Sequence, residues 1–202
     1  MNYPNELSQL VIRNMEIIET APEVIAATEK RLFAAMNARI EKAVRAKKNW
    51  KGCYDLVTDK DEEETTFAPE SWPENEDESY GAYYTLTHTE DSGDYEWLSC
   101  ATGVMGAALC LEFAVDSDWS GLTAKEYKKM LENFYAGNTV LQKAGFTLAP
   151  GKKGIVRPFH FDAEKLASEC PDFDEALAPL EVALEDIFMA HGEFDKFVKE
   201  LQ

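Results

Sequence analysis

Residues 106–116 read GAALCLEFAVD, and their apolar side chains recur at every second position. The odd-numbered residues of this stretch are all apolar: Ala107, Leu109, Leu111, Phe113 and Val115. The even-numbered residues between them are small, apart from Glu112. Successive side chains of a strand point to opposite faces of its sheet. The stretch therefore predicts a strand with one face in the core and Glu112 on the other face.

Further strands are predicted on both sides of this stretch. The sequence YGAYYTLTHTE at 80–90 is rich in aromatic and β-branched residues, which favour strands. A DSGD turn follows it, so residues 94–102 are predicted to return as the second strand of a hairpin. Shorter strands are expected at 53–58 and 65–68, and either a hairpin or a strand after a loop at 147–162. Together they predict a mostly antiparallel sheet of about four to six strands.

Two helices are predicted before the strands. Residues 6–19 and 22–48 carry apolar side chains at three- and four-residue steps, as amphipathic helices do. Pro22 is expected in the first turn of the second helix, where proline is tolerated, behind Thr20 as its cap. This long helix could bury its apolar stripe within the domain, or against a second copy of the chain as a homodimer.

Helices are also predicted after the strands. One begins at a capping box formed by Thr123 and Glu126, and a short one follows Asp162. Another is expected at 172–190, where Pro179 should bend or split it. The order of helices, strands and helices predicts a single α+β domain over 1–202 with helices packed on the sheet.

The charge of the chain is strongly unbalanced. The formal net charge is −18, and residues 51–100 hold two bases and fifteen acids. Such a chain repels the phosphates of nucleic acids and the anionic surface of a membrane, which argues against both as direct partners. Its field favours a basic surface of another protein.

Targeting signals and reactive cysteine motifs are not found in the sequence. The first residues lack a basic head followed by an apolar core, and no apolar run approaches the length of a membrane span. The four cysteines form no CxxC pair. We therefore expect a cytoplasmic protein with reduced thiols.

The acids concentrate in a segment that we expect to be an inserted loop at 59–79. Within it, residues 61–78 read DEEETTFAPESWPENEDE and contain nine acids and no base. Aromatic residues among carboxylates can receive Lys and Arg from a partner, and the neighbouring predicted hairpin adds Tyr80, Tyr83, Tyr84, Tyr95 and Trp97. The predicted partner-binding residues are Glu62, Glu63, Glu64, Phe67, Glu70, Trp72, Glu74, Glu76, Asp77, Glu78, Glu90, Asp91, Asp94 and Glu96.

Motifs of catalysis are absent or incomplete. The chain has three histidines without metal-binding spacing, no GxSxG and no glycine-rich phosphate loop. One alternative remains a small hydrolase or a degenerate nuclease-like enzyme, with a site around Glu112, His88, His160 and Arg157. A nuclease would favour a lysine two residues after Glu112, where Ala114 stands instead.

A calcium-binding module is a second alternative. Residues 116–126, DSDWSGLTAKE, resemble an EF-hand loop: Asp116, Asp118 and Ser120 stand at its first, third and fifth positions. Glu126 stands at the eleventh position of the loop, although the ligand belongs at the twelfth. A strand-to-helix turn with a capping box explains the same residues without a metal.

The sequence thus predicts a non-enzymatic, acidic interaction protein without cofactor or metal. It would bind a basic surface of a partner protein and act as an inhibitor, antidote or adaptor. One form of this hypothesis is a nucleic-acid mimic, whose carboxylates occupy sites built for phosphates. The enzyme and the calcium-binding module remain open as alternatives at this stage.

Overall fold

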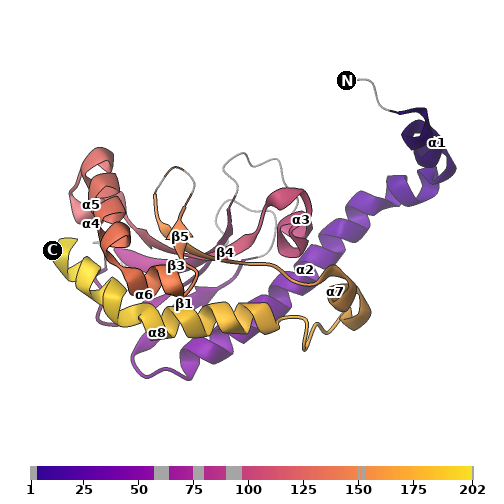
Figure 1. Ribbon diagram of the computed structural model, residues 1–202. Coiled ribbons are helices and arrows are strands. Elements are labelled where there is room, and N and C mark those ends of the chain that lie inside the picture. Colours follow the sequence, from indigo (N-terminus) through magenta and orange to yellow (C-terminus); the bar gives the residue numbers. More distant parts are fainter. Residues whose placement is uncertain are drawn as a thin grey trace.

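The computed structural model describes residues 4–56, 64–74, 80–89, 97–149, 151 and 153–201, without the side chains of Met105, Ser117 and Asp118 (Figure 1). Its helices are α1 (Asn5–Arg13), α2 (Met15–Arg45), α3 (Trp97–Thr102), η1 (Val104–Gly106), α4 (Ser117–Ser120), α5 (Ala124–Gly137), α6 (Thr139–Lys143), α7 (Ala163–Glu169) and α8 (Ala178–Leu201). Its strands are β1 (Trp50–Tyr54), β2 (Thr65–Pro69), β3 (Ala82–His88), β4 (Leu109–Val115), β5 (Thr147–Leu148) and β6 (Ile155–Phe159).

The strands form one six-stranded antiparallel sheet in the order β1-β2-β3-β4-β6-β5. Strand β4, from which the sequence analysis began, lies inside the sheet between β3 and β6. The predicted α+β fold is confirmed, with a long N-terminal helix and C-terminal helices packed on an antiparallel sheet.

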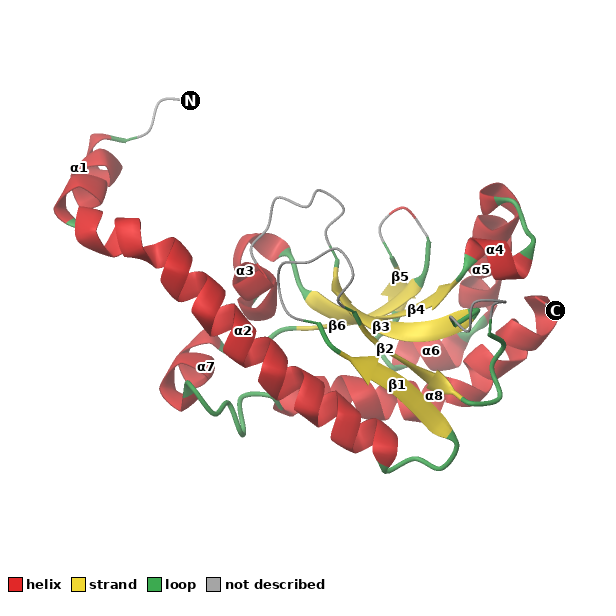
Figure 2. Cartoon of the chain, turned by 180° about the vertical axis from the view of Figure 1, so that it is seen from behind, coloured by secondary structure: helices red, strands yellow, loops and turns green. Residues whose placement is uncertain are grey.

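The two faces of the sheet differ as the alternation in β4 predicts. Residues directly opposite each other on paired strands share a face, so Tyr84 and Phe113 mark the inner face. Both are buried and pack on Phe194 of α8, which lies along this face together with α2 (Figure 2). Thr85 and Glu112, paired on the outer face, are only partly buried. The inner face therefore holds the core.

Helix α2 starts earlier than the sequence analysis predicted. It runs from Met15, so Pro22 lies in its interior and not in its first turn. The hydroxyl of Thr20 donates to the carbonyl of Glu16 one turn back, and Thr20 does not cap a helix. Proline removes one backbone N–H bond, a loss that this exposed part of the helix tolerates because the freed carbonyl can be solvated.

The predicted strand at 94–102 is wrong, because its described part forms helix α3. Strand β3 already pairs with β2 on one edge and with β4 along seven positions on the other, which leaves no edge for a further partner. Trp97 instead packs its ring edge-on against Phe33, at 5.0 Å between centroids. Its aromatic character reflects packing between helices and not strand formation.

The C-terminal predictions are partly confirmed. The capping box of Thr123 and Glu126 opens α5, and the side chain of Asp162 caps α7. The last helix begins at Ala178, so Pro179 lies in its first turn and does not bend it. Within the described part of the chain, none of the helices is long and apolar enough to cross a membrane.

Candidate functional site: an acidic pocket on the outer face of the sheet

A pocket of about 570 Å³ opens on the outer face of the sheet, at its β1-β2-β3 end. It combines three carboxylates, one ammonium group and two phenol rings. The residues that line it are Lys51, Glu64, Thr66, Glu74, Tyr80, Tyr83 and Asp116. We call it the acidic pocket.

Strand register brings these residues together from distant parts of the sequence. Thr66 of β2 lies opposite Cys53 of β1 and Thr85 of β3, which places it on the outer face. Lys51 stands two residues before Cys53, and Tyr83 two before Thr85, so both share this face. The outer face of three neighbouring strands thus forms the floor of the pocket.

The rim comes from the segments that flank these strands. Glu64 directly precedes β2, and a single β-bridge joins Glu74 to Tyr80. Asp116 directly follows β4, and its backbone N–H donates to the carbonyl of Gly81 at 2.9 Å. These contacts hold carboxylates and tyrosines at one end of the sheet.

A lysine of the protein itself occupies this pocket. The ammonium group of Lys51 forms an ion pair with Glu74. The same group lies 5.1 Å from the centroid of the Tyr80 ring, within the range of a cation–π contact. Two further carboxylates, those of Glu64 and Asp116, line the pocket. The pocket therefore accommodates a primary ammonium group and carries more negative than positive charge.

The tyrosines of the pocket remain neutral at physiological pH. Burial raises the pKa of Tyr83 above 10.0, and the nearby carboxylates of Glu64 and Asp116 raise it further. Burial also raises the pKa of Tyr80. Both side chains therefore offer an aromatic face to a cation and a hydroxyl group to a polar partner.

The structure contradicts the prediction that Phe67 and Trp72 bind a partner at the surface. Phe67 is fully buried, and Trp72 is 4% exposed. Phe67 lies on the inner face opposite Tyr84, and the Trp72 ring packs 5.6 Å from that of Phe113. The indole N–H of Trp72 donates to Asp195 of α8 at 3.3 Å. Phe67 belongs to strand β2, and Trp72 follows that strand. The acidic segment therefore contributes both rings to the core.

The other predicted partner-binding residues fall into two groups. Glu64 and Glu74 line the acidic pocket, and Glu70 is exposed outside it. Nine lie outside the described residues: Glu62, Glu63, Glu76, Asp77, Glu78, Glu90, Asp91, Asp94 and Glu96. The sequence analysis did not assign Lys51 or Thr66 to a site, and it assigned Asp116 only to the hypothetical calcium loop. Only the strand register could have revealed them.

The residues of the hypothetical enzyme site do not converge on one face. Glu112 lies on the outer face, whereas His88 lies opposite the inner-face residue Leu109. Arg157 also lies on the inner face and forms a 2.8 Å ion pair with Asp186 of α8. The sheet itself therefore separates Glu112 from two of its proposed partners.

The segment 116–126 has the geometry of a helix start. The carboxylate of Glu126 accepts hydrogen bonds from the backbone N–H and the hydroxyl of Thr123, at 3.0 and 2.6 Å. Asp116 accepts from the backbone N–H of Trp119 at 3.1 Å. Over the described ranges, no group of three or more His, Cys, Asp or Glu residues is placed to hold a metal ion.

Comparisons with known proteins add no relative. No protein-family model, curated protein or solved structure matches the chain. The function therefore has to be inferred from the residues and their geometry.

Proposed function

We propose that the protein binds a basic surface of a partner protein, and that a lysine or arginine of the partner enters the acidic pocket. The observation that carries this proposal is the position of Lys51 among the pocket's carboxylates and tyrosines. An internal lysine that is held by a carboxylate and an aromatic ring marks a place suited to a cationic side chain.

A cation of the partner could displace Lys51 from Glu74 at a small cost in free energy. The side chains of Lys51 and Glu74 are 32% and 44% exposed, and ion pairs of such exposure contribute about 0–1 kcal/mol. Glu64 and Asp116 provide additional carboxylates for an arginine, whose planar group can bind two oxygens at once. The pocket can thus exchange an internal ion pair for an intermolecular one at small cost.

The charge of the whole chain supports the same class of partner. With a net charge of −18, the protein attracts basic surfaces over long distances and speeds their association. A basic surface that otherwise binds nucleic acid would be one such partner. The protein would then act as an inhibitor or adaptor without performing chemistry.

The proposal is tested with two double variants that have the same net charge. Glu64→Gln with Glu74→Gln neutralises two carboxylates of the pocket, and Glu164→Gln with Glu200→Gln neutralises two exposed carboxylates elsewhere. We measure the binding of a labelled peptide of nine arginines by fluorescence anisotropy at increasing salt. The pocket variant should bind about tenfold more weakly than the control variant, since about 1.4 kcal/mol corresponds to a factor of ten.

Capture from a cell extract with the same variants extends the test to the native partner. A basic protein that the wild type and the control variant retain, and the pocket variant loses, would support the proposal. Equal binding by the two variants, or binding that salt does not weaken, would contradict it, because either result would exclude recognition by these carboxylates.

A further inference from the structure

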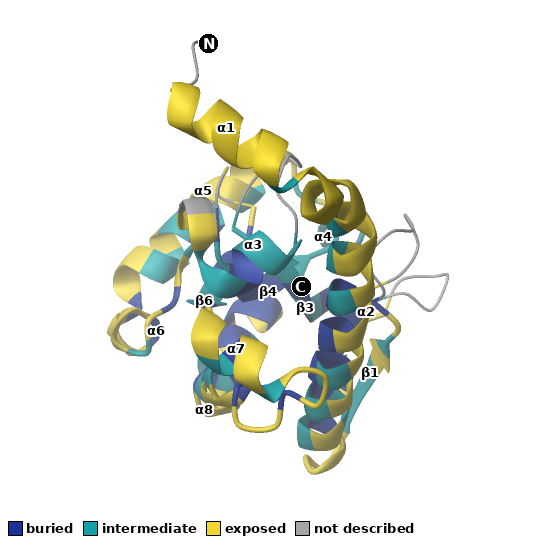
Figure 3. Cartoon of the chain, turned by 90° about the vertical axis from the view of Figure 1, so that its right-hand side faces the viewer, coloured by how far each residue is buried: buried dark blue, intermediate teal, exposed yellow. Residues whose placement is uncertain are grey.

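Residues 5–28, comprising α1 and the first half of α2, form an arm that projects from the domain (Figures 1 and 3). Twelve large apolar side chains are exposed in the described chain, and eight of them belong to this arm. Helix α1 turns away from the axis of α2 at Asn14, and Ile18 of α2 remains exposed. Such a concentration of apolar surface marks an interaction site more often than an ordinary surface.

The exposed half of α2, residues 15–28, continues the apolar face that the second half buries. Met15, Ile18 and Ile25 recur at steps of three and seven residues, and Leu32 extends the series into the core. Residues at this spacing share one helix face. The face that packs within the domain at one end of α2 is therefore open at the other end.

A row of carboxylates runs along one edge of this open face. Glu16, Glu19 and Glu23 follow one another at steps of three and four residues, and all three are exposed. An α-helix turns about 100° per residue, so the three side chains lie within about 60° of one another, beside the apolar face. Within the described chain none of them forms an ion pair, whereas Glu41 in the packed half of α2 pairs with Arg45. The row is therefore open to cations of a partner.

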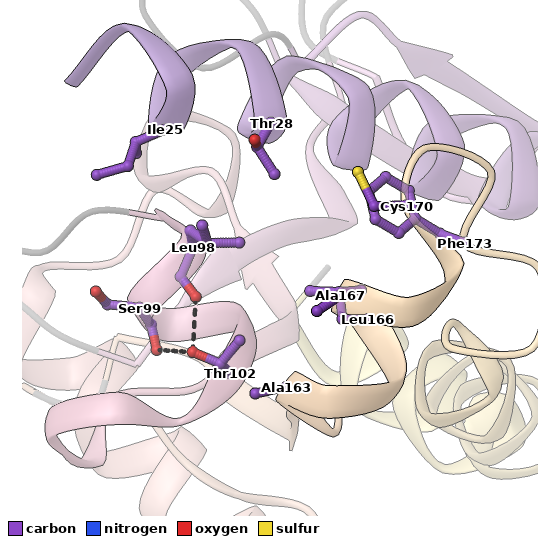
Figure 4. Close-up of a pocket in the computed structure, with 10 residues that line it drawn as sticks. All are labelled: Ile25, Thr28, Leu98, Ser99, Thr102, Ala163, Leu166, Ala167, Cys170 and Phe173. Carbon is purple, nitrogen blue, oxygen red and sulfur yellow. Dashed lines mark hydrogen bonds between the residues drawn. The ribbon is translucent and has the colours of Figure 1, made fainter. Parts of the chain in front are cut away.

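The open face leads into an apolar groove of about 510 Å³ between α2, α3 and α7 (Figure 4). Ile25 and Thr28 contribute one wall, Leu98 the second, and Ala163 and Leu166 the third. None of the residues that line the groove is charged. The groove thus suits an aliphatic side chain.

We propose that the exposed half of α2 and this groove bind an amphipathic helix of a partner protein, with lysine or arginine along one flank of its apolar side. Apolar residues three and four apart on the partner would lie along the open face, and one of them would enter the groove. Its basic flank would face the row of carboxylates. Residues 15–28 span about 20 Å, so about four turns of helix cover the surface. The surface shares no residue with the acidic pocket, so this inference is separate from the proposed function.

The charge of the arm selects a basic partner over other occupants. Its four acids face a single base: Glu6, Glu16, Glu19 and Glu23 against Arg13. A second copy of the chain would bring four more carboxylates to the same surface, and anionic lipid would repel those already there. A basic flank neutralises them and leaves the apolar contact intact.

The test uses three synthetic peptides of about 18 residues, long enough to cover the surface as helices. Each carries leucine on one helix face, and the other face carries lysine, glutamine or glutamate. Fluorescence anisotropy measures the binding of each labelled peptide to the full chain. The lysine peptide should bind about tenfold more tightly than the glutamine peptide, and the glutamate peptide should not bind.

Matched charge variants locate the binding of the lysine peptide. Glu16→Gln with Glu23→Gln should weaken it about tenfold relative to Glu164→Gln with Glu200→Gln, which has the same net charge. The acidic-pocket variant, Glu64→Gln with Glu74→Gln, should bind as the control does. This last comparison separates the inference from the proposed function, because each can fail without the other.

A matched pair of apolar variants tests the open face. Ile18→Asn should weaken binding of the lysine peptide about tenfold. Met189→Asn makes a similar change at a position of α8 that is 84% exposed, and should leave binding unchanged. Circular dichroism confirms that each variant is folded.

Four outcomes would overturn the proposal. Equal binding by Ile18→Asn and Met189→Asn would exclude the open face, and equal binding of the lysine and glutamine peptides would exclude recognition of charge. A wild-type dimer that Ile18→Asn dissociates in sedimentation velocity would assign the face to a second copy. Cosedimentation with anionic vesicles that Ile18→Asn abolishes would assign it to a membrane.

Discussion

The two halves of α2 have the same apolar spacing and opposite environments. In the second half, Leu32, Met36 and Ile40 are at most 1% exposed. In the first half, Ile17 is 66% exposed and Val24 60%. Periodicity specifies a helix and the face that it will bury, but burial requires another element opposite that face. The comparison shows that one sequence pattern can form core and surface within a single helix.

Contacts around the second half account for the difference. Arg39 forms ion pairs with Asp174 and Glu181 near the start of α8, at 3.0 and 2.5 Å. The side chain of Asn37 donates to the carbonyl of Leu56, two residues after β1. The last such contact toward the N-terminus is that of Glu29, whose carboxylate accepts from the backbone N–H of Leu98 at 2.7 Å. Before Glu29, the described residues of α2 form no hydrogen bond or ion pair with the sheet or with α8.

The largest difference in the free energy of unfolding should appear when one isoleucine in each half of α2 is shortened to alanine. Ile40→Ala removes packed methyl groups from the core and should lower the free energy of unfolding by about 2–5 kcal/mol. Ile18→Ala, at an exposed position, should change it by less than about 0.5 kcal/mol. Urea denaturation at dilute protein, where a dimer would be dissociated, measures both. Equal losses would show that the arm folds against the domain.

An intermediate effect is expected from the two asparagines of the N-terminal region. The side chain of Asn37 donates to the carbonyl of Leu56 at 3.0 Å and accepts from the hydroxyl of Thr65 at 2.6 Å. Asn37→Ala removes the donor to the carbonyl of Leu56 and the acceptor of the Thr65 hydroxyl, and should cost about 1–3 kcal/mol. Asn14→Ala, at the half-buried turn between α1 and α2, should cost less than about 0.5 kcal/mol. The same denaturation experiment would contradict this ranking if Asn14→Ala were the more damaging change.

The smallest expected effect is a dependence of stability on pH. It arises in the packed domain, at His191. The ring of His191 lies 5.0 Å from that of Trp50 and 5.5 Å from that of Trp72, and burial lowers its pKa below 6.5. As the pH falls below 6.5, the unfolded chain binds this proton before the folded protein does, so stability should decrease until the lowered pKa is passed. His191→Gln should remove this part of the pH dependence of thermal unfolding. A slope that is unchanged in His191→Gln would assign the pH dependence to other groups.

Local sequence patterns predicted the elements whose signals are contained within them. Strand β4 followed from its alternation, and the start of α5 from a capping box four residues long. The strand predicted at 94–102 failed because aromatic residues fill helix contacts as well as strand faces. Phe67 and Trp72 were misassigned although a strand was expected at 65–68, because the acids around both residues suggested an exposed surface and not a contribution to the core.

The acidic pocket shows the limit of a reading by segments. The acidic character of Glu64 and Glu74 was visible in the sequence. Their approach to Lys51, Tyr83 and Asp116 depends on the antiparallel register of β1 to β4. A shift of one residue would move Lys51 or Tyr83 to the inner face, because side chains alternate along a strand.

By itself the sequence determined the longer helices, the alternating strand, the charge and the α+β class, since each depends on residues that are near in the chain or on totals. Tertiary structure alone decided which apolar stripe becomes core and which carboxylates share a pocket. The physical reason is that burial and electrostatic convergence depend on the distances between elements, and those distances exist only after the sheet has paired and α8 has packed on it.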